Sequence, residues 1–521
     1  MTLVSVAAAA LYAHTLFLQH AGALWRDEAN TAAFAGMPSL GAIWSSLRYD
    51  SVPLVSTLLV RAWAGLGGGS DSGLRWLGWI VGCGVLAATG LSARLLRLPM
   101  PSCSPLLFAL NVWVIRGGDA IRPWGLGMLL IILAFASLGW ALQRPRPWSV
   151  VLAALCAVLS VHTLYANAIL VAAMCLAGVA TGLSHRSRAR AFVSLGVGLA
   201  AGLSLLPYIP ALRGAGDWGA LVRTGADVSR IWTALASTAE WDGWGWVLLA
   251  MAGIAVAVAQ ATRASRAAPE WERSNSLYAA ITLAGGALAF LGFVVWSRLP
   301  TQPWYYLPLI ALGSVSLDVL VGPLLRRPGA RLASCAIILL VTVLHLPAAA
   351  PQLRVRQTNL DLVAADVGIN AGPRDLVIVT HWFFGITFHR YYSGHAPWMT
   401  IPPLEDTRIH RYDLLKRLME HPEAVHSSVL EAISRTLMAG GRVFLVGGLP
   451  ALSKGETPVP PPPAPAAGFG WDVHAYTDRW ERLVVATLQE HVMEVKEVPV
   501  SSPGPVIDYE KAPLYELRGW Q

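Results

Sequence analysis

The sequence is poor in charged residues and has no lysine before position 416. Only 13% of its 521 residues are Asp, Glu, Lys or Arg, whereas 55% are hydrophobic. Soluble domains carry about 25% charged residues. The composition therefore excludes a disordered chain and an ordinary soluble enzyme, and it indicates an integral membrane protein with many spans.

Cysteines and the common phosphate and metal motifs are also scarce. All five cysteines precede residue 351, so the polar tail that begins at Pro351 folds without disulfides. No glycine-rich phosphate loop follows a predicted strand, and neither a CxxC nor an HExxH motif occurs. The chain therefore carries neither a common nucleotide fingerprint nor a standard zinc motif.

Basic residues are concentrated in the first 350 residues, which hold 23 arginines and 12 acidic residues. The tail carries 16 basic and 19 acidic residues, so the net charge of +8 comes from the arginines of the apolar part. Arginines at membrane edges explain this charge, and it does not indicate nucleic acid as a partner.

About eleven apolar stretches could cross a bilayer, since a span needs about 20 apolar residues. They cover approximately 3–22, 73–95, 103–117, 122–142, 148–161, 163–183, 191–210, 244–261, 276–296, 304–324 and 331–348. Segment 51–67 is short and carries Arg61 near its middle, so we expect a helix lying at the outer surface.

Arginine clusters between these spans predict the orientation of the chain. With 51–67 at the surface, 13 of the 23 arginines fall on one side of the membrane. Because basic loops stay in the cytoplasm, the N-terminus is predicted to be cytoplasmic and the tail extracytoplasmic. The clusters are Arg94/Arg97, Arg144/Arg146, Arg186/Arg188/Arg190, Arg263/Arg266/Arg273 and Arg326/Arg327/Arg331.

We predict a mainly α protein with two domains. A polytopic transmembrane domain covers 1–350, and its first outer loop, 24–72, carries surface helices. A soluble extracytoplasmic α/β domain covers 351–521, and a proline-rich loop occupies 458–468.

Alternating and continuous apolar patterns predict the elements of the tail. VIVT (377–380) and VFLVGG (443–448) are typical of buried strands, and MEVKEVPV and APLYELRG predict two closing strands. The segment 477–491 predicts an amphipathic helix with Thr477 as its N-cap.

Two adjacent carboxylates, Asp27 and Glu28, directly follow the first predicted span. Carboxylates so near lipid need water or a role, which suggests a general base at the mouth of a cavity. An ordinary solvated loop start explains them equally well. Asp50 either returns to the same site or, more simply, caps the helix that follows it.

Arg122 stands at the outer start of a predicted span, where a guanidinium can bind a phosphate. Pairing with Asp119 or snorkelling to the interface explains it equally well. His162 and Tyr165 occur in an outer turn between two apolar segments. A lone histidine there is more simply a turn residue with satisfied hydrogen bonds than a catalyst.

Arg298 precedes an aromatic run that contains Tyr305 and Tyr306. An interfacial aromatic belt beside an arginine is the simpler interpretation. The same side chains could line a groove for a lipid or for the face of a sugar.

Together these features resemble the GT-C glycosyltransferases, which use polyprenyl-phosphate sugars. The likeness is greatest to the protein O-mannosyltransferases and the lipid A aminoarabinose transferases, and it covers nearly the whole chain. It is carried by the order of Asp27-Glu28-Ala29, Asp50-Ser51-Val52-Pro53, Arg122-Pro123-Trp124, His162 with Tyr165, and Tyr305-Tyr306-Leu307-Pro308.

The resemblance implies a GT-C fold and an inverting single displacement. Asp27 would deprotonate an acceptor hydroxyl that attacks the anomeric carbon while the lipid phosphate leaves, and Glu28 is the second candidate catalytic residue. Relatives often carry Lys-Pro-Pro or His-Pro-Pro where this chain has Ser51-Val52-Pro53. The residues expected to bind the donor phosphate in place of that base are Arg122, Arg298 and Arg48, and those expected to bind substrate are Asp50, His162, Tyr165, Tyr305 and Tyr306.

The implied partners are a polyprenyl-phosphate-linked sugar, a lipid, glycan or protein acceptor, and the bilayer of the inner or plasma membrane. No cofactor is required, because arginines can replace a metal. Some relatives use a divalent cation, and Asp27, Glu28 and Asp50 could hold Mg²⁺ or Mn²⁺. A polytopic transporter or flippase, and a catalytically silent scaffold with the same fold, are the alternative functions.

Overall fold

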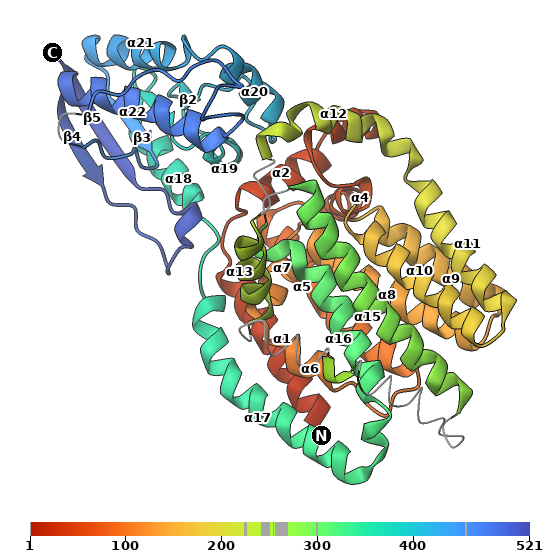
Figure 1. Cartoon of the computed structure of the whole chain (residues 1–521). Coiled ribbons are helices and arrows are strands. Elements are labelled where there is room, and N and C mark those ends of the chain that lie inside the picture. The colour runs from red at the N-terminus through yellow and green to blue at the C-terminus, as the bar shows by residue number, and fades with distance from the viewer. Residues whose placement is uncertain are drawn as a thin grey trace. The chain divides into compact units, whose positions relative to one another are not determined.

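The computed structural model describes residues 2–222, 227–240, 251–253, 255, 269–298, 301–453 and 456–521. The chain forms two compact units, and each is built from three separate segments of the sequence (Figure 1). Unit 1 consists of Met1–Gln19, Ser51–Pro210 and Gly225–Arg354, and unit 2 consists of His20–Asp50, Ala211–Thr224 and Val355–Gln521. Unit 2 thus contains the polar tail together with two segments from the apolar part of the sequence.

Helices make up unit 1. They are α1 (Thr2–His20), α4 (Leu54–Trp63), η2 (Ala64–Gly68), α5 (Asp71–Leu95), α6 (Cys103–Leu107), α7 (Val112–Asp119), α8 (Pro123–Gln143), α9 (Pro147–Val161), α10 (Asn167–Ser184), α11 (Arg188–Ser204), η3 (Leu206–Tyr208), α13 (Val228–Ala239), α15 (Glu270–Ser297), η5 (Pro303–Tyr306), α16 (Leu307–Val321), η6 (Leu324–Arg326) and α17 (Pro328–Leu353). Helix α12 (Ile209–Gly219) continues from η3 into unit 2.

Prolines start several of these helices. Pro123, Pro147 and Pro328 each occupy the first position of α8, α9 or α17, where the missing N–H costs no hydrogen bond. Helix α8 is apolar on all sides and mostly buried among α5, α9, α10 and α16. A helix without a polar face belongs at the centre of a bundle, and this is where α8 packs.

Eight helical segments of the described chain are long and apolar enough to cross a membrane. Together with the many exposed apolar side chains of α11 and α17, this identifies a multi-pass membrane protein. Two further apolar helices, Leu54–Gly68 and Pro147–Val161, are shorter. The predicted span 244–261 lies largely outside the described residues, so the count of eleven stays a prediction.

The predicted span at 103–117 is wrong, because this stretch forms two short helices, α6 and α7. Helix α6 ends before Phe108, and Asn111 begins α7, since its side chain accepts a hydrogen bond from the N–H of Val114. The N-terminus of α6 is fixed by Asp318 from α16. Its Oδ1 accepts the backbone N–H groups of Ser102, Cys103 and Ser104 at 2.7, 2.6 and 3.2 Å.

A buried pair of polar side chains joins α1 to α7. His14 Nδ1 lies 2.7 Å from Asp119 Oδ1, and the two side chains are 1% and 2% exposed. Helix α5 makes room for this pair with glycine, because a Cβ at Gly82 would lie 1.8 Å from Asp119 Oδ1. Small residues let helix backbones approach closely in membranes, and Gly82 serves that purpose here.

Unit 2 combines helices with one mixed sheet. Its helices are α2 (Arg26–Ala35), α3 (Leu40–Ser46), η1 (Leu47–Tyr49), η4 (Ala220–Val222), α18 (Leu360–Asn370), α19 (Phe384–Tyr391), α20 (Tyr412–Glu420), α21 (Val425–Met438), α22 (Val473–His491) and η7 (Asp508–Glu510). Its strands are β1 (Leu376–Val379), β2 (Trp398–Thr400), β3 (Val443–Val446), β4 (Val492–Val498) and β5 (Leu514–Trp520).

The sheet has the order β2-β1-β3-β5-β4. Strand β1 pairs in parallel with β2 and β3, whereas β5 runs antiparallel to β3 and β4. Alternate residues of β1 and β3 face opposite sides, as the pleat requires. Ile378 and Leu445 pack with α20, α21 and α22, while Val377 and Phe444 pack with α18 and α19 (Figure 1).

Strands β1, β3, β4 and β5 occur where the sequence places them, whereas β2 was not predicted and one helix begins earlier than predicted. Helix α22 starts at Val473, and Thr477 lies inside it rather than capping it. Asp472 is the N-cap, because its carboxylate accepts the N–H groups of His474 and Ala475. A carboxylate at this position stabilises a helix start better than the threonine further along the pattern.

Candidate functional site

The first turn of α2 gives the adjacent carboxylates Asp27 and Glu28 different surroundings. Glu28 is fully buried, and its Oε2 accepts the backbone N–H of Trp25 at 3.4 Å, which closes the start of the helix. The side chain of Asp27 stays 16% exposed. Negative charge is favourable at a helix N-terminus, so both carboxylates suit this turn. Asp27 is the one that solvent can reach.

A histidine of the tail, His410, lies against Asp27. His410 Nε2 is 3.2 Å from Asp27 Oδ1, and the backbone N–H of His410 donates to Asn30 Oδ1 at 2.9 Å. Asn30 in turn donates through Nδ2 to Asp50 Oδ2 at 2.9 Å. Asp50 therefore returns to the Asp27 region; the capping interpretation is wrong, because Pro53 is the N-cap of α4.

Arg26 connects Asp27 with a second residue of the tail, Glu510. Its Nε lies 3.7 Å from Asp27 Oδ1 and 3.4 Å from Glu510 Oε1, and its guanidinium stacks 4.4 Å from the ring of Phe383. Glu510 is fully buried, and this burial raises the pKa of its carboxyl group to about 8 even though Arg26 opposes the shift. Asp27 thus lies in a polar cluster that the tail completes.

Stacked aromatic rings support this cluster. The ring of Tyr412 stacks on His410 with centroids 5.7 Å apart, and Trp218 also stacks on Tyr412, at 5.1 Å. Trp382 contacts both His410 and Tyr412 edge-on. Trp218 also donates through Nε1 to the carbonyl oxygen of Arg48 at 2.7 Å. The predicted phosphate ligand Arg48 is itself exposed, and its guanidinium donates to the hydroxyl of Tyr49.

In unit 1, Arg122 belongs to an aromatic cluster. It is 8% exposed, and its guanidinium lies 5.2 Å from the centroid of Trp124. Trp124 contacts Trp304. The ring of Trp304 in turn contacts the partly exposed Tyr305, with ring centroids 6.2 Å apart. The structure thus brings the predicted residues Arg122 and Tyr305 into one cluster, although the two lie far apart in the sequence.

The other predicted residues of unit 1 lie in different surroundings. Tyr306 is fully buried and its hydroxyl lies 2.7 Å from Thr301 Oγ1. Arg298 is exposed at the C-terminal end of α15. The remaining two, His162 and Tyr165, surround Tyr208, whose hydroxyl lies 3.0 Å from His162 Nδ1.

His162 has both ring nitrogens in hydrogen bonds, since Nε2 lies 3.0 Å from Ser204 Oγ. Its carbonyl oxygen also accepts the N–H of Val55 at 3.0 Å. This is the turn residue with satisfied hydrogen bonds that the sequence favours, and it joins α9 to η3 and α4.

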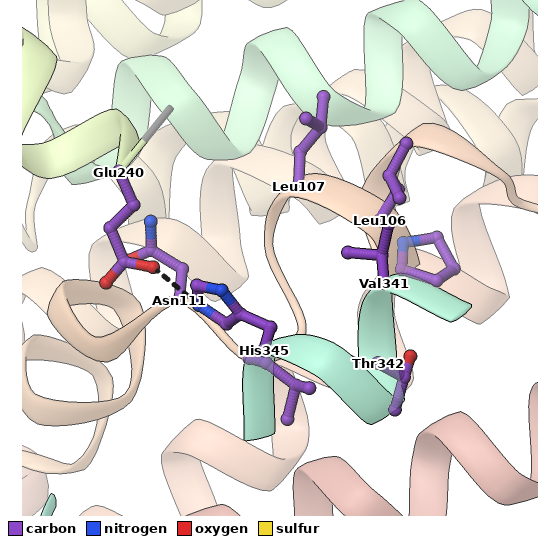
Figure 2. Close-up of a pocket in the computed structure, with 9 residues that line it drawn as sticks. Leu106, Leu107, Asn111, Glu240, Val341, Thr342 and His345 are labelled. Carbon is purple, nitrogen blue, oxygen red and sulfur yellow. Dashed lines mark hydrogen bonds and ion pairs between the residues drawn. The ribbon is translucent and has the colours of Figure 1, made fainter. Parts of the chain in front are cut away.

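A separate small pocket lies in unit 1 where α6, α13 and α17 meet. Figure 2 shows Glu240 and His345 pointing toward each other, and His345 Nε2 lies 3.1 Å from Glu240 Oε2. Glu240 Oε1 accepts the N–H of Val112 at 2.6 Å. The Glu240–His345 pair thus joins the end of α13 to α7 and α17. Both oxygens of the Glu240 carboxylate already have hydrogen-bond partners, so the pair is poorly suited to take part in a reaction.

Metal ligands do not gather within the described part of the chain, where no group of three or more His, Cys, Asp or Glu is placed to hold a metal ion. Asp27, Glu28 and Asp50 are instead engaged with His410, the N–H of Trp25 and Asn30.

Sequence reasoning missed His410, Glu510 and Asn30. His410 and Glu510 follow Asp27 by several hundred positions, and no local pattern links them to it. Asn30 directly follows Asp27-Glu28-Ala29. Its position about one helical turn after Asp27 was the one sequence feature that could have placed its side chain beside Asp27.

No family model matches the chain, and no curated protein matches it. A solved structure does: the crystal structure of ArnT from Cupriavidus metallidurans bound to undecaprenyl phosphate has a TM-score of 0.51 and 14% sequence identity. The match covers 99% of this chain and 97% of that chain. The likeness confirms the expected GT-C fold, and at this identity it shows the fold alone.

Proposed function

We propose that this membrane protein is a GT-C glycosyltransferase that moves a sugar from a polyprenyl-phosphate donor to an acceptor hydroxyl. The observation that carries the proposal is the Asp27 carboxylate. It is partly exposed, stands at a helix N-terminus and contacts His410 and Arg26. The ArnT structure holds undecaprenyl phosphate, which supports a polyprenyl-phosphate lipid as the donor carrier.

In the proposed reaction Asp27 is the general base. It takes the proton of the acceptor hydroxyl while that oxygen forms a bond to the anomeric carbon. The bond from the anomeric carbon to the phosphate oxygen breaks, its electron pair leaves with the polyprenyl phosphate, and the anomeric configuration inverts. Arg26 favours the ionised form of Asp27 that this step needs.

The leaving phosphate needs positive charge. We propose Arg122 for this role, since its guanidinium is held over Trp124 in a dry environment where charge acts strongly. Arg298 and Arg48 are the other candidates, and both are exposed. Asp50, His162, Tyr165, Tyr305 and Tyr306 are proposed to line or support the substrate site. Arginine supplies the charge in this scheme, so no Mg²⁺ or Mn²⁺ is required, although Asp27, Glu28 and Asp50 could hold one.

The experiment is to incubate the full-length protein, in lipid nanodiscs, with a panel of radiolabelled undecaprenyl-phosphate sugars. Transfer of label to an added membrane extract, or release of free sugar by hydrolysis, supports the enzyme. The Asp27→Asn variant, prepared in parallel, should show neither product. Extracts from several bacteria broaden the choice of acceptors.

Two other outcomes separate the alternative functions. In sealed vesicles, movement of intact labelled donor across the bilayer without turnover would identify a transporter or flippase. Binding without turnover or movement would identify a catalytically silent scaffold. Of the intramembrane carboxylates, Asp318 is engaged by four donors of α6 and the residue before it, which favours a structural role over transport.

A further inference from the structure

His410 contacts α2 at two points on one face of the helix. Its ring meets the side chain of Asp27 at 3.2 Å, and its backbone N–H meets the side chain of Asn30 at 2.9 Å. Positions 27 and 30 are three residues apart, so their side chains are neighbours on the helix surface. A single residue of the tail is therefore fixed to the predicted catalytic turn by both its ring and its backbone.

The imidazole ring of His410 has little freedom to rotate. Tyr412 stacks on it nearly in parallel, at an interplanar angle of 19°, and Trp382 approaches it edge-on at 79°. The residue is 8% exposed. Stacking on one face and an edge contact from another ring define the direction in which Nε2 points, and that direction is toward Asp27.

Hydrogen bonding also assigns the proton on the ring. His410 Nδ1 is buried and has no hydrogen-bond partner within the described residues, whereas Nε2 meets a carboxylate oxygen. A proton on Nδ1 would be buried without an acceptor, so the neutral ring carries its proton on Nε2. The tautomer that results donates to Asp27.

We propose that His410 is a positioning residue for Asp27, and this inference rests on the proposed transferase function. Its Nε2–H donates to Asp27 Oδ1, which holds the carboxylate in one orientation and stabilises the ionised form that accepts the proton of the acceptor hydroxyl. The tail is then part of the reaction site. Arg26 faces Asp27 and also lies against Glu510, and the charges of Asp27 and Glu28 act on the carboxyl group of Glu510.

The test compares three full-length variants in the transfer assay described above. His410→Phe removes the hydrogen bond and keeps a ring between Tyr412 and Trp382. His410→Gln returns an N–H donor of similar reach. The matched control is His491→Phe, because His491 also stacks on a ring, Trp520 at 4.9 Å, and bonds through one nitrogen to the carbonyl oxygen of Gln521.

Loss of a hydrogen bond to a charged group that takes part in the reaction lowers the rate by about 10- to 100-fold. We expect His410→Phe to lower kcat by about that factor with little change in the KM for donor. The acidic limb of its pH–rate profile should move upward by about one pH unit, because the ionised carboxylate loses a donor. His410→Gln should recover most of the lost rate, and His491→Phe should match the wild type.

Unfolding of each variant is followed by thermal denaturation, so that a folding defect is recognised and not counted as a catalytic one. If His410→Phe is folded and has the kcat and pH profile of the wild type, the inference is wrong while the transferase function stands. If His410→Gln is as impaired as His410→Phe, the hydrogen bond is not the cause. A wild-type protein that neither transfers nor hydrolyses any donor overturns both proposals.

Discussion

His410 Nε2 lies 3.2 Å from Asp27 Oδ1, although 383 positions separate the two residues in the sequence. The contact exists because segment 20–50 folds with the tail in one compact unit. Removing or loosening the tail should therefore change the environment of the proposed base directly. The tail of this protein cannot be treated as a binding module that is independent of the chemistry.

Asp27→Asn should reduce the rate of sugar transfer by at least about 100-fold, because the amide cannot accept the acceptor proton. The initial rate with a labelled polyprenyl-phosphate sugar measures this effect. Asp472→Asn is the matched control, since Asp472 is an exposed N-cap and asparagine caps a helix equally well. Turnover by Asp27→Asn close to that of the wild type would remove the assignment of Asp27 as the base.

Glu510 should make the stability of the protein depend on pH. Burial raises the pKa of its carboxyl group from an ordinary 4.5 to about 8, so the folded state holds a proton that the unfolded state has released. The stabilising contribution of Glu510 is complete below pH 4.5, the ordinary pKa of a glutamate, and it is lost as pH rises through about 8. Between these values each pH unit lowers the free energy of unfolding by up to about 1.4 kcal/mol.

Thermal unfolding measured from pH 5 to pH 9 tests this dependence, with Glu510→Gln as the variant and the exposed Glu497→Gln as its control. Glu510→Gln should flatten the curve, and Glu497→Gln should not. A smaller slope should remain above pH 6.5, because the hydrogen bond that His381 Nδ1 donates to Glu481 Oε1 raises the pKa of His381 above its ordinary 6.5. An unchanged curve in Glu510→Gln would show that Glu510 is ionised at neutral pH.

Asp318→Ala should destabilise the protein by at least about 3 kcal/mol, because three backbone N–H groups and the hydroxyl of Ser104 would be buried without an acceptor. Asp227→Ala removes a comparable cap from the exposed start of α13 and should cost only about 1 kcal/mol. The apparent melting temperatures in detergent measure both effects. Equal losses for the two variants would contradict the role of Asp318 as a buried anchor.

Gly82→Ala should weaken the packing of α1, α5 and α7. The added Cβ would meet Asp119 Oδ1 at 1.8 Å and the His14 ring at 2.9 Å, so the helices must separate at a cost of about 1–3 kcal/mol. Gly90→Ala lies in the same helix with nothing within 4 Å of its Cβ and should be neutral or slightly stabilising. Melting temperatures that fall alike in both variants would show a general effect of the substitution on α5.

Local patterns in the sequence predict many of the helices well. Long apolar runs match α1, α5, α8, α10 and α17 because a membrane span needs a hydrophobic surface along its whole length. The prediction failed at 103–117, where Asn111 caps a helix start within an apolar run. Hydropathy averages over such a residue, whereas one side-chain hydrogen bond to the backbone is enough to begin a new helix.

Composition and hydropathy are enough to identify a polytopic membrane protein with a polar tail and with two carboxylates at the start of its first loop. Composition and hydropathy are local properties, so they can be read along the chain. The folded chain is needed to show that Glu28 closes a helix turn while Asp27 faces His410 and Arg26. That distinction depends on burial and on partners from distant segments, and neither is encoded in the spacing of nearby residues.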